Sequence, residues 1–321
     1  MMSKVFDTVA LGETLIDFTE HGVSEQGNPI FEANPGGAPC NVLAMLRNLG
    51  KTCAFIGKVG DDIFGRELKA ITAGAGIDTQ ALIEDADVRT TLAFVKTLEG
   101  GDRDFSFYRN PGADMMLTED ELPEDMIRNA RIFHIGSLSM THDGIRRATR
   151  KAVALAKDGG ALISFDPNLR PPLWEKEEDA LEQIEWGLAH CDILKIADNE
   201  IEFVTGKTDF DAGAAVLQEK YPGIRLLNVT AGAEGSYSYY RDMKAFEPAS
   251  TLGGVIETTG AGDTFCGCVL NYVLENGIDD LKEEQLHEML RFANTAAYLV
   301  TTKKGAFRSM PTRSEVEELI G

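Results

Sequence analysis

Residues 131–165 read RIFHIGSLSMTHDGIRRATRKAVALAKDGGALISF. The apolar runs at 131–135 and 161–165 have the length and composition of buried strands, and residues 144–157 between them indicate a helix. Strands that pair in parallel need a crossover of a dozen or more residues, which is usually a helix. The stretch therefore predicts a strand–helix–strand unit of an α/β fold.

The same alternation extends in both directions along the chain. Further strands are predicted at 5–11, 53–59, 193–196 and 226–229, and further helices at 36–49, 64–73, 180–188, 212–221, 264–275 and 284–301. Short apolar strands that alternate with amphipathic helices are typical of a mainly parallel sheet covered on both faces. No break in composition marks a second unit, so we expect residues 1–321 to form a single domain.

Two segments break this pattern. Residues 18–31 are polar and Gly-rich, and residues 91–97 and 104–108 indicate two strands joined by the turn Glu99-Gly100-Gly101-Asp102. We expect a small β-sheet lid, built from segments at about 14–34 and 89–110, that excludes water from a crevice. The alternative is an ordinary β excursion that packs on the core.

Composition narrows the class of protein. The chain is 43% hydrophobic and 26% charged, as ordinary globular proteins are. Its formal net charge of −21 argues against nucleic acid and anionic membranes as partners. Five cysteines without metal-binding spacing indicate buried thiols in a reducing compartment. Residues 1–7 lack the apolar stretch of a signal peptide and no run could span a bilayer, so we expect a cytoplasmic protein.

The strongest chemical signal is Thr258-Thr259-Gly260-Ala261-Gly262-Asp263, which comes directly before the apolar run at 264–270. The first N–H groups of a helix lack internal partners, and glycines let a phosphate approach them closely. An aspartate in such a turn repels phosphate unless it has another task, such as taking a proton from an attacking hydroxyl. A tight turn whose acid favours a helix start is the alternative.

Several other turns at strand ends carry polar side chains and glycines. They contain Asp17, Gly36, Gly37, Asn41, Arg109, Arg170, Asn199, Glu202, Thr230, Gly232 and Gly235. Acceptors, amide donors and bare backbone suit a polyhydroxylated ligand, although each of these residues could equally be a cap or turn residue. The chain contains no Walker-type phosphate loop and no dinucleotide fingerprint after its first strand.

Taken in order, these segments resemble the ribokinase-like (PfkB) carbohydrate kinases from residue 12 to residue 311. Residues 35–41 (PGGAPCN), 107–117 (FYRNPGADMML) and 166–174 (DPNLRPPLW) resemble the fructokinase branch, and the last of these is shared with 2-keto-3-deoxygluconate kinases. The resemblance implies a three-layer α/β sandwich with a small β-sheet lid, ATP and Mg²⁺ as cofactors, and a homodimer formed through the lid.

The resemblance also assigns roles to residues. Asp263 would be the base, and the amides of Gly260, Ala261 and Gly262 would form an anion hole. The sugar would be held by Asp17, Gly36, Gly37, Asn41 and Arg109, with Arg170 touching the sugar or the phosphoryl group. Asn199, Thr230, Gly232, Gly235 and Asn294 would serve the nucleotide, and Glu202 would serve Mg²⁺ through water. Glu257, Thr259 and Ser309 match a monovalent-cation site, but Glu257 replaces the usual Asp, which leaves potassium open.

The resemblance therefore implies an ATP-dependent fructokinase that forms fructose 6-phosphate and ADP. Ala38 stands where ribose-specific members carry Lys, which agrees with a hexose or keto-sugar site. A 2-keto-3-deoxygluconate kinase of the same fold is the alternative within the family. A non-catalytic sugar-binding protein on a kinase fold is the alternative from another class.

Overall fold

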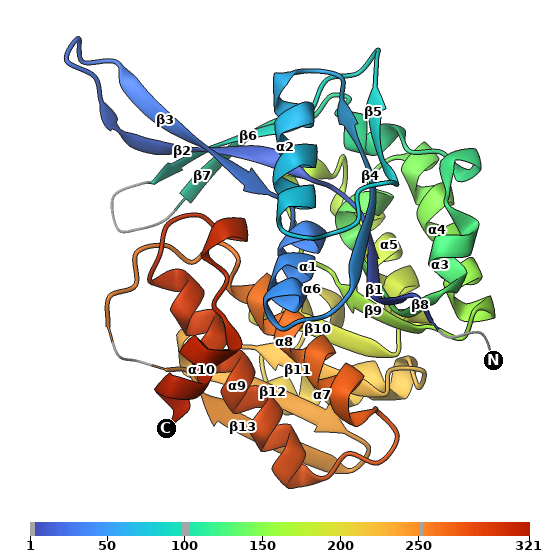
Figure 1. The fold of residues 1–321 in the computed structure, drawn as a ribbon. Coiled ribbons are helices and arrows are strands. Elements are labelled where there is room, and N and C mark those ends of the chain that lie inside the picture. The colour runs from blue at the N-terminus through green and yellow to red at the C-terminus, as the bar shows by residue number, and fades with distance from the viewer. Residues whose placement is uncertain (1–3, 98–102, 251–252) are drawn as a thin grey trace.

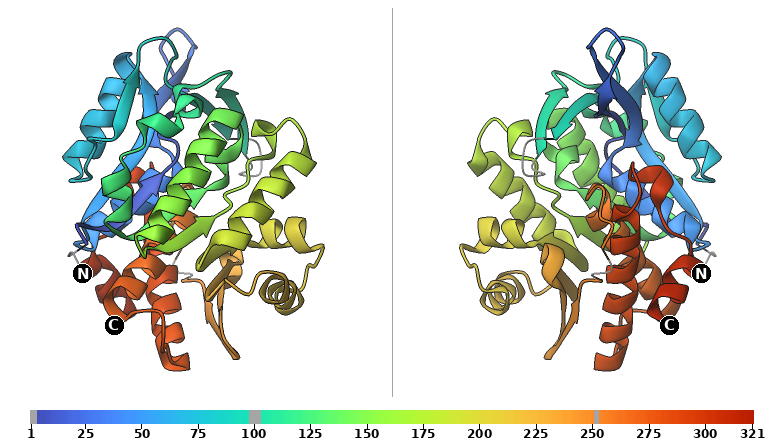
Figure 2. Two further views of the ribbon diagram at one scale, coloured as in Figure 1. Left: turned by 90° about the vertical axis from the view of Figure 1, so that its right-hand side faces the viewer. Right: turned by 90° about the vertical axis from the view of Figure 1, so that its left-hand side faces the viewer.

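The structure, a computed structural model, describes residues 4–97, 103–250 and 253–321. A nine-stranded sheet lies between two layers of helices, and a second, four-stranded sheet projects from one end of the molecule (Figures 1 and 2). The expected three-layer α/β fold is confirmed. In the described ranges, none of the helices combines the length and the apolar character that crossing a bilayer requires.

The order of strands in the central sheet is β13-β12-β11-β10-β9-β8-β1-β4-β5. The bounds are β1 Phe6–Leu11, β4 Cys53–Gly60, β5 Leu82–Asp85, β8 Ala130–Gly136, β9 Leu162–Asp166, β10 Ile193–Ala197, β11 Leu226–Thr230, β12 Gly235–Tyr240 and β13 Met243–Pro248. Seven of these strands run parallel, and the hairpin β12–β13 continues the sheet in the antiparallel sense. All the parallel strands therefore end at one edge, where open α/β sheets bind their ligands.

Helices cover both faces of this sheet and define two apolar cores. One layer contains α1 Ala38–Asn48, α2 Ile63–Gly74, α8 Ala261–Asn276, α9 Glu283–Thr301 and α10 Arg313–Ile320. The other contains α3 Glu124–Arg128, α4 Asp143–Asp158, α5 Glu177–His190, α6 Asp198–Thr205 and α7 Phe210–Lys220. Every residue of β4 is buried, as expected for a strand covered on both sides.

The second sheet, called the lid sheet here, has the order β3-β2-β6-β7. Its strands are β2 Leu15–Val23, β3 Pro29–Gly36, β6 Leu92–Thr97 and β7 Arg103–Tyr108. The expected small sheet is thus present and separate from the central one, whereas the predicted turn at 99–102 lies outside the described residues. Phe18 and Phe94 stack on its surface with ring centroids 4.8 Å apart.

Candidate active site

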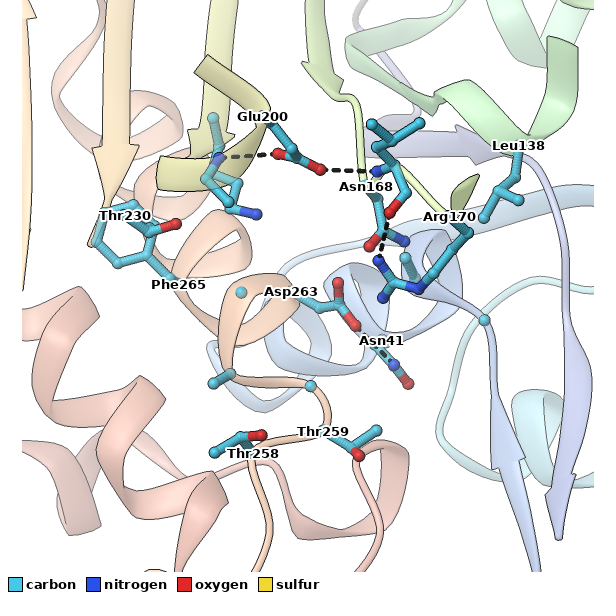
Figure 3. A pocket seen from close by; sticks show the side chains of 18 of the residues that line it. Asn41, Leu138, Asn168, Arg170, Glu200, Thr230, Thr258, Thr259, Asp263 and Phe265 are labelled. Carbon is cyan, nitrogen blue, oxygen red and sulfur yellow. Dashed lines mark hydrogen bonds between the residues drawn. The ribbon is translucent and has the colours of Figure 1, made fainter. Parts of the chain in front are cut away.

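A cleft of about 450 Å³ opens at the edge where the parallel strands end (Figure 3). Its walls come from the chain that follows β1, β8, β9, β10 and β11, and from the first turns of α1 and α8. The predicted site residues that border it are Asp17, Gly37, Asn41, Arg109, Arg170, Asn199, Thr230, Gly232, Gly235, Thr259, Gly260, Ala261, Gly262, Asp263 and Asn294. The predicted residues Gly36, Glu202, Glu257 and Ser309 do not border it.

The glycine turn before α8 has the expected form. Gly260 is the N-cap residue with φ 81, and a Cβ there would lie 2.5 Å from the Cβ of Ala306, so only glycine fits. Among the described residues, no side chain forms a cap hydrogen bond to this helix. Its first N–H groups therefore lack partners inside the helix, although that of Ala261 donates to the Thr258 carbonyl at 3.3 Å. They carry the positive end of the helix dipole toward the cleft. The turn can accept an anion such as phosphate.

Asp263 lies in the first turn of α8 and projects into the cleft beside Asn41 and Arg170 (Figure 3). Its Oδ2 atom accepts a hydrogen bond of 2.7 Å from Nδ2 of Asn41 in α1. Burial raises the pKa of Asp263 to about 6, the charge of Asp166 adds to the rise, and the Asn41 hydrogen bond opposes it. Such a carboxylate is ionised at neutral pH yet basic enough to accept a proton, as a general base must be.

Two charged residues without a predicted role, Lys195 and Glu200, form the floor of the cleft, and Asp166 supports them from behind. The ammonium of Lys195 in β10 lies 3.1 Å from Oδ2 of Asp166 at the end of β9. Glu200 in α6 accepts from the N–H groups of Leu169 at 2.7 Å and Ala197 at 2.8 Å (Figure 3). Burial raises the pKa of Glu200. A lysine inside an otherwise apolar strand is the one sequence signal that points to this floor.

Arg109 borders the cleft, but protein acceptors already engage its guanidinium group. Nε donates to Asp114 at 2.7 Å, Nη1 to Thr141 at 2.8 Å and Nη2 to the Leu138 carbonyl at 3.0 Å. Arg109 and Asp114 are both buried. Nη2 also lies 2.7 Å from Asp114. This arrangement fixes the chain that leaves the lid sheet, so a sugar could use only the one remaining N–H of Arg109.

The predicted sugar residues meet where α1 begins. Gly37 is the N-cap of α1 with φ 112, and a Cβ there would lie 2.4 Å from the Glu13 carbonyl oxygen. Gly36 contributes indirectly, because a Cβ at that position would lie 2.2 Å from Oδ2 of Asp17. Both glycines therefore make room for neighbouring atoms, and Gly36 is the one predicted sugar residue that does not border the cleft.

The predicted nucleotide residues lie at the other end of the cleft. Asn294 of α9 borders it, but its amide nitrogen donates to the carbonyls of Glu247 at 2.8 Å and Pro248 at 3.2 Å. Its Oδ1 atom accepts from Ser236 at 2.8 Å. Asn294 thus fastens the β12–β13 hairpin to α9, and this fixes the shape of the cleft wall next to Thr230.

The described residues of the cleft include too few protein ligands to bind Mg²⁺ by themselves, so the ion would have to bind together with substrate phosphates. Asp198 and Asn199 border it with exposed side chains, whereas the exposed Glu202 lies outside it. No group of three or more His, Cys, Asp or Glu side chains in the described ranges is arranged to hold a metal ion. Mg²⁺ commonly keeps several waters and uses one or two carboxylates together with substrate phosphates. Asp198 and Asn199 are therefore the residues that would hold such an ion through water.

Two of the three residues predicted for a monovalent cation border a common cavity. Glu257 and Thr259 border a separate cavity of about 20 Å³, and Glu257 accepts a long hydrogen bond of 3.4 Å from the Gly305 N–H. Ser309 is buried, does not border this cavity, and donates its hydroxyl proton to the Lys304 carbonyl at 2.5 Å. The cavity therefore contains two of the three predicted ligands.

Comparison with known proteins identifies the family. The sequence profile of the pfkB family carbohydrate kinases matches residues 6–313. Fructokinase-1 of Zea mays is 44% identical over 314 residues, which cover 97% of each protein. A fructokinase from Xylella fastidiosa with bound ATP has a TM-score of 0.88 at 32% identity over 98% of both chains. A fructokinase double mutant from Vibrio cholerae O395 with bound fructose, ADP and potassium has a TM-score of 0.86 at 26% identity, over 99% of this chain and 100% of that one. The chain therefore belongs to the pfkB family of carbohydrate kinases, which confirms the resemblance inferred from its motifs.

Proposed function

We propose that this kinase transfers the terminal phosphoryl group of ATP to the primary hydroxyl of fructose, forming fructose 6-phosphate and ADP. The observation that carries the proposal is the placement of Asp263 inside the cleft, hydrogen-bonded to Asn41 and adjoining the glycine turn at the start of α8. The fructokinase names of its relatives, together with the nucleotide and fructose bound in two related structures, support this choice of substrates.

In this proposal Asp263 takes the proton of the sugar hydroxyl as its oxygen bonds to the terminal phosphorus. The bond from that phosphorus to the bridging oxygen breaks, and its electron pair leaves on ADP. Charge that spreads over the phosphoryl oxygens is stabilised by the N–H groups of the turn at Gly260–Gly262 and by the guanidinium of Arg170. Mg²⁺, held through water by Asp198 and Asn199, would supply further positive charge there.

The sugar site is proposed to lie between the lid sheet and α1. Asp17 and Asn41 offer hydrogen-bonding groups there, and Gly37 leaves the backbone accessible. Hydroxyls of a buried sugar need matched partners, because an unsatisfied polar group costs about 1–3 kcal/mol. The nucleotide is proposed to lie toward Thr230 and Gly232, with its phosphates near the start of α8.

We further propose a homodimer that forms through the lid sheets. Large apolar side chains are exposed on its strands, among them Val23, Ile30 and Phe31, and such a surface commonly marks an interface. A cytoplasmic location is likewise proposed. It is supported by five cysteines that are all buried and free, as expected in a reducing compartment.

The proposal is tested by measuring ADP release over fructose, 2-keto-3-deoxygluconate, ribose, tagatose and nucleosides, with Asp263→Asn as the background control. We expect fructose to give the highest kcat/KM, and NMR of the product to show phosphate on the primary carbon. Preference for 2-keto-3-deoxygluconate by more than about tenfold, which corresponds to roughly 1.4 kcal/mol, would contradict the proposed substrate. ADP release that is independent of any sugar would contradict the proposed reaction.

A further inference from the structure

Lys195 is a buried cation on the sheet side of the cleft. It lies between Leu194 and Ile196 in β10 and is 6% exposed, yet it borders the cleft. Its ammonium is 3.1 and 3.3 Å from the two carboxylate oxygens of Asp166. Ion pairing alone does not account for a lysine at this place, because apolar residues of similar volume usually stabilise a core at least as well as a buried ion pair.

The ammonium of Lys195 also lies against the glycine turn. A Cβ at Gly262 would be 3.1 Å from Nζ of Lys195, so the missing side chain at Gly262 leaves this approach open. Burial by itself lowers the pKa of Lys195, but the charges of Asp166, Glu200 and Asp263 raise it above its ordinary value. The group is therefore positively charged throughout the working pH range.

The donors of this ammonium are not all used by the protein. An ammonium carries three N–H donors. In the part of the chain that the structure describes, Asp166 alone accepts hydrogen bonds from Lys195. At least one donor is thus left for a ligand in the cleft. The start of α8, whose first N–H groups carry the positive end of the helix dipole, borders the same part of the cleft, so two sources of positive charge meet beside the carboxylate of Asp263.

We propose that Lys195 is a further catalytic residue whose ammonium contacts the phosphate that is transferred, with Asp166 and Glu200 as its positioning residues. The inference rests on the proposed ATP-dependent reaction. As the bond to ADP breaks and the bond to the sugar oxygen forms, negative charge spreads over the phosphoryl oxygens, and a fixed cation stabilises it. Asp166 fixes the ammonium directly, and Glu200 joins the chain segments that follow β9 and β10.

The test compares ADP with a non-hydrolysable ATP analogue, because only the analogue carries the phosphate that Lys195 is proposed to contact. In Lys195→Met the affinity for the analogue should fall about 10- to 100-fold, as for the loss of a hydrogen bond to a charged group. Affinity for ADP, measured by calorimetry in the same buffer, should be unchanged. Turnover with saturating sugar should fall about 10²–10³-fold, the usual effect of removing one such donor.

Lys58→Met is the matched control. Lys58 is also a lysine in a parallel strand, is also 6% exposed, and pairs with Asp85 at 3.4 Å and Glu121 at 2.7 Å, but it does not border the cleft. This variant should keep the wild-type ratio of the two affinities and the wild-type turnover. If Lys195→Met does not fold because Asp166 is left unpaired, the double variant Lys195→Met/Asp166→Asn removes both charges and is measured in the same way.

An equal loss of affinity for ADP and the analogue, or no loss for either, overturns the inference and leaves Lys195 a purely structural residue. A selective loss for the analogue supports it. The binding measurements contain no sugar, so they do not depend on which sugar is phosphorylated. A wild-type enzyme that does not phosphorylate fructose would overturn the proposed substrate, but the binding result for Lys195 would be unaffected.

Discussion

The hydrogen bond between Asn41 and Asp263 should set the pH at which the enzyme becomes active. The carboxylate of Asp263 must be ionised to take a proton, and burial raises its pKa from the ordinary value of 3.8 to about 6. The wild-type kcat/KM should therefore fall as the pH drops through about 6, because this parameter reports the pKa values of the free enzyme. The 2.7 Å bond from Asn41 stabilises the ionised form, so its removal must raise the pKa of Asp263 further.

The perturbation is Asn41→Leu, which keeps the approximate size of the side chain and removes the donor. A hydrogen bond to a charged group contributes about 1.5–3 kcal/mol. Since one pKa unit corresponds to about 1.4 kcal/mol, the acid limb of kcat/KM should move up by about one to two pH units. The direction of this shift is fixed, because the lost hydrogen bond stabilised only the ionised form of Asp263.

The assay is coupled ADP release from pH 5 to pH 9 with fructose held well below KM. ATP also titrates in this range, but it does so identically for every variant, so the difference between the variants is the informative quantity. Asn48→Leu serves as the control, because Asn48 lies in the same helix and donates to the Met310 carbonyl at 2.8 Å, away from the cleft. An acid limb in Asn41→Leu that stays in place or moves to lower pH would refute the assignment of Asp263 as the base.

Three further results are expected. The folded-state pKa of Asp263 is about 6, above its ordinary value of 3.8, so stability is lost as the pH rises from about 4 to about 6. Asp263→Asn should therefore raise the free energy of unfolding by up to about 3 kcal/mol at pH 8 and by roughly a third of that at pH 4.5 in urea titrations. An equal increase at both pH values would count against the raised pKa. Val23→Lys, at a lid-sheet side chain that is 68% exposed, should leave the fold intact and convert the proposed dimer to a monomer in sedimentation, and an unchanged mass would rule out the lid interface. Replacing potassium by tetramethylammonium should leave kcat unchanged, because only two of the three predicted cation ligands, Glu257 and Thr259, border one cavity and Ser309 does not. Clear activation by potassium would show that these residues do form a cation site.

Most of the central sheet and its helices could be predicted from apolar periodicity, because strands covered on both faces and helices that bury one stripe have distinct patterns. The β12–β13 hairpin could not. Its first strand, GSYSYY, alternates polar and aromatic residues over only six positions and forms the antiparallel extension of the sheet. Such a short run carries little signal until the neighbouring strand is known.

The site was predictable where a local motif determines it. The glycine turn before Asp263 is an example, since φ at Gly260 and the start of α8 follow from adjacent residues. The pairing of Asn41 with Asp263 joins residues 222 positions apart, and no spacing in the sequence reveals it. The buried pair of Lys195 and Asp166 joins two strands in the same way.

Glu200 and Glu202 show how a small error in helix phase changes an assignment. Because α6 begins at Asp198, Glu200 turns back onto the ends of β9 and β10 and is buried, while Glu202 turns outward to solvent. Both residues occur in the same motif, and the start of the helix decides which one faces the cleft. Sequence reasoning cannot fix such a boundary to one residue.

The most direct measurement is the comparison of turnover and binding in Asp263→Asn. Loss of the base should lower kcat for fructose by about 10²–10⁴-fold, while calorimetry should find fructose and ADP bound with nearly wild-type affinity. A variant that binds both ligands and still turns over at the wild-type rate would show that the aspartate beside the glycine turn does not take the proton.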